Sequence, residues 1–225
     1  MRSSYIPLLM LLSLMVSCSS GSNDLTSDGL KGKVKSIKEL QFESTYENDR
    51  WVAGKPSLYG GRIVNYNQDG LYVESFSISS EGDTLGVSTC RREDGEMVEE
   101  NFRSTYDRTT SRTLLEKVSA EQVNFEIWQN QQLIYEGANY FNKKGRILRQ
   151  VQVGNDREVT VYHVYDKNML VENYREEISG ERSATQLYEY DEFDDEGNWT
   201  VRLIYVGEEK ITPELVITRE LTYYD

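Results

Sequence analysis

Three residue types that often carry chemistry or interrupt strands are scarce here: one histidine, two cysteines and three prolines in 225 residues. His163 would have to be the base of any hydrolase triad, yet it lies in the middle of an expected strand, Val159–Tyr165. No Gly-x-Ser-x-Gly sequence surrounds a serine. A structural zinc site needs about four Cys or His ligands, which this chain does not offer. The sequence therefore predicts a protein that is not an enzyme, with no catalytic residues, metal or cofactor.

Positive charge is also in short supply. Lysine and arginine total 25 against 38 aspartates and glutamates, for a net charge of −13. Such a surface repels phosphate backbones, so we expect no nucleic-acid partner. The acidic run Asp191–Asn198 does not fit a calcium loop of the EF-hand type, because the closing glutamate would fall at Leu203. A solvated hairpin tip is the interpretation that we favour.

A hydrophobic run of membrane-spanning length is missing, but a shorter one lies at the N-terminus. Ile6–Val16 has the size of a signal-peptide core and is too short to remain as a spanning helix. It ends in Leu14–Cys18, which resembles the lipobox of bacterial lipoproteins. We therefore predict a signal peptide over 1–17, lipidation of Cys18 and a flexible tether over 18–30. The alternative is an ordinary secretory signal with an incidental cysteine.

Lipidation of Cys18 has two consequences. It leaves Cys90 without an intramolecular disulfide partner, and a cysteine packed in a strand is then the simplest expectation. It also places the protein on a membrane of the bacterial envelope, most simply the outer membrane. Few acidic residues follow the cysteine, which favours the periplasmic face over the cell surface.

Alternation of apolar and polar residues recurs through the mature chain and predicts strands. Clear examples are Val159–Tyr165, Trp199–Val206 and Leu215–Tyr224, and the 16 tyrosines add to the strand preference. Helical spacing is weak. The best segment for a short helix is Asp107–Gln122, which lacks glycine and proline.

Several expected strands are separated by one recurring pattern: an aromatic residue, Asn or Asp, two polar residues and Gly. It occurs at Tyr66–Gly70, Phe141–Gly145 and Phe193–Gly197. Tyr165–Asn168 is a variant in which Asn takes the place of Gly. Asn and Asp bond to the backbone two residues on, and Gly or Asn supplies a positive φ. The pattern therefore predicts tight hairpins.

Two segments carry a family resemblance. Tyr188–Asp191 followed by Gly197, and Phe141–Ile147, are similar to the YD (RHS-type) repeat, and Arg219–Asp225 resembles the strand that closes such units. Together with the lipobox, the chain resembles YD-repeat-like lipoproteins of the Bacteroidetes. The resemblance implies a repeat domain over 31–225 whose motif residues are structural. The region 53–112 fits the repeat only loosely.

We therefore expect an all-β fold, an antiparallel meander of repeated hairpins that forms an elongated, curved and twisted sheet. A compact β-sandwich or a barrel is the alternative. Strand-borne aromatic side chains could bind a glycan or a protein partner, although they could equally pack the sheet itself. The candidates are Trp51, Trp128, Trp199 and Tyr205.

The function expected is that of a non-catalytic envelope protein, anchored to the membrane by its lipid, that binds or scaffolds an unknown glycan or protein partner. Two other functions stay open. One is a hydrolase of polymers that uses paired carboxylates. The other, implied by the YD resemblance, is a partner or immunity protein of a secreted toxin.

Overall fold

The computed structural model describes residues 24–154 and 156–225. One short helix precedes fourteen strands: α1 Asp24–Asp28, β1 Val34–Glu47, β2 Arg50–Tyr66, β3 Tyr72–Ile78, β4 Thr84–Glu93, β5 Glu96–Ser104, β6 Thr110–Ser119, β7 Gln122–Gln129, β8 Gln132–Phe141, β9 Ile147–Gly154, β10 Arg157–Tyr165, β11 Val171–Ile178, β12 Glu181–Phe193, β13 Trp199–Val206 and β14 Leu215–Tyr223. No helix among these residues is long and apolar enough to cross a membrane.

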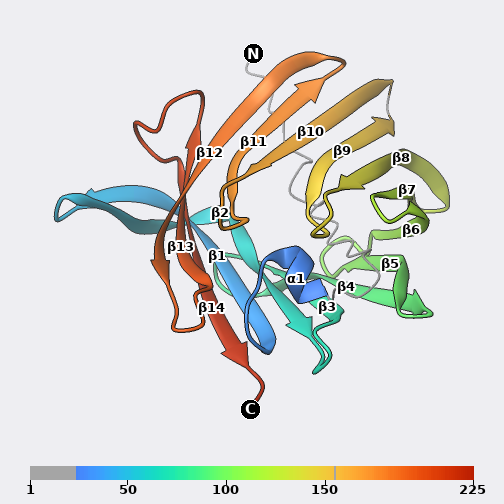
Figure 1. Ribbon diagram of the computed structural model, residues 1–225, viewed down its shortest axis with the longest axis horizontal. Coiled ribbons are helices and arrows are strands. Elements are labelled where there is room, and N and C mark those ends of the chain that lie inside the picture. Colours follow the sequence, from blue (N-terminus) through green and yellow to red (C-terminus); the bar gives the residue numbers. More distant parts are fainter. Residues whose placement is uncertain (1–23, 155) are drawn as a thin grey trace.

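The fourteen strands form one closed antiparallel barrel (Figure 1). Each strand pairs with its neighbour in sequence, as expected for hairpins, but β1 also pairs with β14 from Val34↔Tyr223 to Glu43↔Leu215. The expected open, elongated sheet is therefore wrong, and the barrel that stood as an alternative is the fold. An open sheet would leave the backbone groups of β1 and β14 unpaired at two edges, and closure removes both edges.

The recurring turn pattern forms one local structure at one end of the barrel. In the β2–β3 turn, Asn67 Oδ1 accepts hydrogen bonds from the backbone N of Asp69 and of Leu71, both at 3.0 Å. The side chains of Asn142 and Asp166 accept equivalent bonds in the β8–β9 and β10–β11 turns. A single polar oxygen thus closes each of these turns.

One detail of that pattern differs from expectation. Gly70 and Gly145 both have φ of 76°, and the equivalent position of the β10–β11 turn is Met169, with φ of 63°. Asn168, the residue expected to replace glycine, precedes that position. A methionine in the left-handed region is strained, so the turn must be held by the hydrogen bonds to Asp166 and by the barrel around it.

The segment considered for a helix is a strand. Thr110–Ser119 forms β6, and Leu115 pairs with Phe125 of β7. The short helix considered within Asp107–Gln122 does not form, because the apparent helical spacing of its leucines competes with period-two alternation in the same residues. Pairing with strands on both sides decided between the two.

The main apolar core lies inside the barrel. Its buried members come from α1 and the segment after it, from β1–β3 and from β5–β8, and only the interior brings these elements together: Leu25, Leu30, Val34, Ile37, Val64, Tyr66, Tyr72, Met97, Leu115, Val123, Phe125, Ile127 and Phe141. Cys90 packs against this core, and its Sγ lies 3.2 Å from the backbone O of Tyr72. Burial raises the pKa of the Cys90 thiol, which suits a packed rather than a reactive cysteine.

The helix α1 fills the end of the barrel where the patterned turns lie. Asp24 accepts a 2.6 Å hydrogen bond from the backbone N of Tyr72 and pairs with Arg92 of β4. Arg146 Nη1 donates to Ser27 O at 2.8 Å. Figure 1 shows α1 close to the middle of the ring of strands. The segment therefore ties β3, β4 and the start of β9 together.

The predicted tether falls partly on these residues. Its lipidated residue, Cys18, and residues 19–23 lie outside the described residues, as does the predicted signal peptide over 1–17. Asp24 and Leu30 are both buried. The part of the predicted tether that is described is thus packed into the barrel.

A buried ion cluster joins the two ends of the sheet. Glu39 of β1 accepts hydrogen bonds from Arg62 Nε of β2 at 2.5 Å and from Arg219 Nε of β14 at 2.6 Å. Burial by itself would raise the pKa of Glu39, but the two arginines outweigh burial and hold that pKa well below its usual value. The cluster connects three adjacent strands at the point where the barrel closes.

Candidate ligand-binding site

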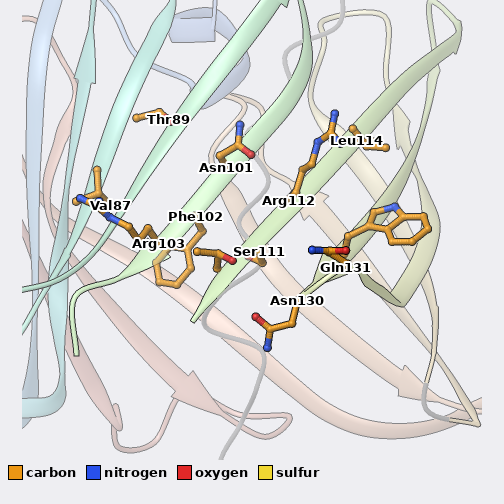
Figure 2. A pocket seen from close by; sticks show the side chains of 12 residues that line it. Val87, Thr89, Asn101, Phe102, Arg103, Ser111, Arg112, Leu114, Asn130 and Gln131 are labelled. Carbon is orange, nitrogen blue, oxygen red and sulfur yellow. The ribbon is translucent and has the colours of Figure 1, made fainter. Parts of the chain in front are cut away.

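A hollow of about 650 Å³ lies over strands β4–β7 (Figure 2). Its lining is Val87, Thr89, Asn101, Phe102, Arg103, Thr110, Ser111, Arg112, Leu114, Trp128, Asn130 and Gln131. A volume of this size is typical of a small-molecule or oligosaccharide site.

The strand register places four lining residues in one row across the sheet. Thr89 pairs with Asn101, Asn101 with Arg112, and Arg112 with Trp128. Their sequence neighbours face the other way, since Ile127 is in the inner core. The row therefore projects from the outer face of the barrel, and directly opposed side chains in it are roughly 5 Å apart at Cβ.

Trp128 is the aromatic residue of the hollow. Its ring is half-buried, and its Nε1 donates a 2.9 Å hydrogen bond to Glu126 Oε2 on the same strand. Leu114 lies on the neighbouring strand, where its partner is Glu126. The indole is thus fixed in orientation beside an apolar side chain, which suits it to stack against a flat ligand.

Arg112 is held in place by a buried carboxylate. Its Nη2 lies 2.8 Å from Glu99 Oε2, and Arg91 Nη2 lies 3.1 Å from the same oxygen. Asn101 Nδ2 donates to the other oxygen of Glu99 at 2.9 Å. Hydrogen bonds from Arg112 and Asn101 lower the pKa of Glu99 to about 2, so this carboxylate stays ionised. Glu99 is 8% exposed and is not among the residues that line the hollow.

The charge of the lining is opposite to that of the protein. Its two charged residues are Arg103 and Arg112, and none of its twelve members is acidic, although the chain has a net charge of −13. Arg103 forms no ion pair with the residues that the structure describes. Figure 2 shows Asn101 between the two arginines. The hollow is therefore a cationic patch on an acidic protein.

The four aromatic candidates occupy three separate places. Trp128 lines the hollow, whereas Trp199 is 5% exposed in an inner cluster with Ile204 and Ile217. Tyr205 is 4% exposed and donates a hydrogen bond to Glu189 at 3.2 Å.

Trp51 is half-buried in the same outer cluster as Tyr205 and meets the ring of Tyr46 at a centroid distance of 5.0 Å. The structure thus brings Trp51 and Tyr205 together and separates them from Trp128. Trp199 and Tyr205 have little surface left for a ligand.

The sequence interpretation did not find Arg103 or Arg112. Both lie in the region 53–112, which fits the repeat only loosely, and Arg112 falls in the segment considered for a helix. The alternation of Asn101 and Arg103 with Phe102 indicates a strand that has Asn101 and Arg103 on one face. The proximity of Arg103 and Arg112 to Trp128 depends on the β5–β6 and β6–β7 registers.

Other reactive groups lie away from the hollow. His163 is on β10, with its ring centroid 5.6 Å from that of Tyr174, and burial lowers its pKa to about 4. It is therefore neutral near pH 7. No group of three or more His, Cys, Asp and Glu side chains is placed to hold a metal ion in the part of the chain that the structure describes.

Comparisons with known proteins connect this fold to solved structures. The chain is similar to a porin-like protein from Bacteroides vulgatus ATCC 8482, with a TM-score of 0.51 and 15% identity over 85% of this chain and 98% of that chain. The likeness shows the fold. A porin-like protein from Bacteroides uniformis ATCC 8492 covers the same shares at 7% identity, with a TM-score of 0.35. No family model and no curated protein matches the sequence.

Proposed function

We propose that this chain is a lipid-anchored, non-catalytic protein of the bacterial envelope that binds a glycan in the outer hollow through Trp128. The observation that supports this most directly is the half-buried indole beside a hollow of about 650 Å³. Amide and hydroxyl side chains, including Asn101 and Asn130, lie in the same lining. An aromatic plane with a few hydrogen-bonding groups around it is the combination that a sugar ring requires.

The lining also favours binding over hydrolysis. A glycosidase of the usual type places two carboxylates roughly 5 to 10 Å apart across the scissile bond. The twelve lining residues include neither Asp nor Glu. Glu99 is ionised and already engaged with two arginines, which makes it a poor proton donor.

The outer face of the barrel supports a position in water beside the membrane. Charged side chains project from it in at least half of the strands, each next in sequence to an inward-facing residue: Lys38, Arg91, Glu116, Glu126, Arg149, Arg175 and Glu220. A membrane-spanning barrel has an apolar outer band about 25 Å tall, and Arg or Lys at its midplane costs roughly 2–4 kcal/mol. This distribution favours attachment through a lipid on Cys18 over spanning strands.

The same outer face has a row of stacked side chains that is stable in water. Tyr140 of β8 pairs with Arg149, and Arg149 with Tyr162 of β10. The guanidinium of Arg149 lies 4.1 Å from the ring centroid of Tyr140, and that of Arg175 lies 4.4 Å from Tyr162. Alternating cations and rings of this kind are suited to an aqueous sheet surface. The likeness to a porin-like protein further supports a place in the outer membrane or envelope.

The test is a glycan-binding measurement on the purified full-length protein. An array of neutral and acidic oligosaccharides identifies a ligand, and titration gives its Kd. We expect Trp128→Ala to weaken binding roughly 10-fold or more, because removal of a central aromatic contact commonly has that effect. Trp51→Ala is the matched control, since Trp51 is a half-buried outer tryptophan away from the hollow. An array without binding, or equal Kd values for Trp128→Ala and the wild type, would refute the proposal.

A further inference from the structure

The hollow has a feature that a site for neutral sugars does not need. Two arginines lie in its lining, and no acidic residue of the lining offsets them. Chance placement would favour the opposite sign, because acidic residues outnumber basic ones by 38 to 25. A cationic hollow attracts anions, whereas the rest of this acidic surface repels them.

The strand register sets the separation of the two arginines at the backbone. Arg103 pairs with Thr110 and Asn101 pairs with Arg112, so Arg103 and Arg112 are diagonal neighbours on adjacent strands. Diagonal neighbours in an antiparallel pair are roughly 7–8 Å apart. Asn101 lies between them (Figure 2). Two cations at this spacing, separated by an amide, match a chain of sugar rings better than they match one small anion.

The two arginines are available to different degrees. Arg112 shares Glu99 with Arg91, and Arg91 also pairs with Glu93, so these four side chains together carry no net charge and the excess positive charge of the hollow comes from Arg103. Glu99 is buried, whereas the side chain of Arg112 is 52% exposed and is accessible to a ligand. Arg103 forms no ion pair with the residues described here, so its full charge is available. Arginine is well suited to the task because its planar fork binds carboxylate and sulfate groups through two parallel hydrogen bonds.

From this geometry we infer that the ligand is an acidic oligosaccharide of at least two sugar units, with anionic groups bound by Arg103 and Arg112 and one ring stacked on Trp128. Trp128 is the direct cross-strand partner of Arg112, so a stacked ring and a bound anionic group can belong to the same sugar unit. The amide of Asn130 and the Oδ1 of Asn101, whose Nδ2 already donates to Glu99, are left for hydroxyl groups. The inference rests on the proposed glycan-binding function and adds the charge of the ligand.

The experiment compares probes that differ only in charge. Trigalacturonate and its full methyl ester have the same rings and linkages, and the ester is neutral. A sulfated disaccharide tests whether sulfate replaces carboxylate. Kd values are measured by isothermal titration calorimetry with the purified full-length protein, at two salt concentrations.

We expect an acidic probe to bind at least 10-fold more tightly than the neutral ester, and its affinity to fall as salt rises. Arg103→Gln and Arg112→Gln should each weaken binding of the acidic probe roughly 10-fold, since a charge-assisted hydrogen bond has been removed. Binding of the ester should change little. Arg182→Gln removes an exposed arginine of β12 that pairs with Glu208, far from the hollow, and should bind like the wild type.

The outcomes separate this inference from the function on which it rests. Equal binding of acid and ester, lost in Trp128→Ala, would overturn the acidic ligand and leave the glycan-binding proposal standing. Binding of the acid that Arg103→Gln and Arg112→Gln do not weaken would also overturn the inference. A wild type that binds no probe and no glycan of the array would overturn both.

Discussion

Asp28, at the end of α1, provides a test of how this helix is held in the barrel. Tyr66 Oη donates to Asp28 Oδ2 at 2.5 Å, and burial raises the pKa of Asp28 from 3.8 to about 7. The neighbouring Asp24 raises it further, whereas that hydrogen bond and the charges of Arg62 and Arg219 lower it. Folding therefore stabilises the neutral carboxyl.

The sign and size of the effect on stability follow from these values. Between about pH 4 and pH 7 the folded protein holds a proton on Asp28 that the unfolded chain has released. The free energy of unfolding therefore falls as pH rises through this range. The difference between 3.8 and about 7 corresponds to roughly 4 kcal/mol at 1.36 kcal/mol per pKa unit.

His163 opposes this trend. Burial lowers its pKa from 6.5 to about 4, so the unfolded chain binds a proton below pH 6.5 that the folded protein does not. Stability from His163 is present above pH 6.5 and is lost as pH falls toward 4, by roughly 3 kcal/mol. In the wild type, the effects of Asp28 and His163 on the free energy of unfolding largely cancel between pH 4.5 and 6.5. Burial also raises the pKa of Glu100, so Glu100 changes stability with pH in the same direction as Asp28.

Single variants separate the two groups. Urea unfolding of Asp28→Asn and the wild type, followed by tryptophan fluorescence from pH 4.5 to 8, gives the difference in free energy of unfolding. This difference should shift by roughly 3–4 kcal/mol in favour of Asp28→Asn over that range, because other groups cancel in the comparison. His163→Gln should shift in the opposite direction, becoming relatively more stable toward pH 4.5. A difference between Asp28→Asn and the wild type that does not vary with pH would refute a neutral Asp28 in the folded protein.

Three further predictions concern the barrel and its anchor. Glu39→Gln should destabilise the protein by about 3–5 kcal/mol in urea unfolding, because Arg62 and Arg219 would stay buried without a counter-charge; a loss below about 1 kcal/mol would contradict the role given to this cluster in closure. Gly70→Ala should lower stability by about 1 kcal/mol and Met169→Gly should raise it by up to about 1 kcal/mol, since both positions have a positive φ; shifts of the same sign in thermal melting would argue against equivalent turns. Cys18→Ala should move the protein from the membrane to the soluble fraction, and retention in the membrane would refute lipid anchoring.

The tight turns could be predicted from the sequence because they depend on interactions between residues close together in the chain. The turns beginning at Asn67, Asn142 and Asp166 were located from sequence because one side-chain oxygen and one residue of positive φ, within five residues, are sufficient to define them. In the β10–β11 turn the pattern predicts the positive φ at Asn168, but the structure has it at Met169, and the cause is not local. Methionine has no intrinsic preference for that conformation, and only the surrounding pairing imposes it.

The candidate site likewise has one part that the sequence predicts and another that depends on the tertiary structure. Trp128 was a candidate because an aromatic residue is visible in any sequence, and Trp199 and Tyr205 looked equivalent to it. Burial distinguishes them, and burial depends on which strands lie over each face. Arg103 and Arg112 had no sequence signal that linked them to Trp128, because cross-strand proximity is a property of register.

The sequence by itself determined an all-β chain of consecutive hairpins, the positions of its tight turns and an acidic surface, since alternation, turn chemistry and charge act over a few residues. Only the tertiary structure decided that the sheet closes, that α1 fills one end, and that a cationic hollow lies beside Trp128. Closure joins β1 to β14 through pairs such as Glu39 and Arg219, which are 180 residues apart. A pattern of period two is the same in an open sheet and in a barrel, and what differs is whether the two edge strands find each other.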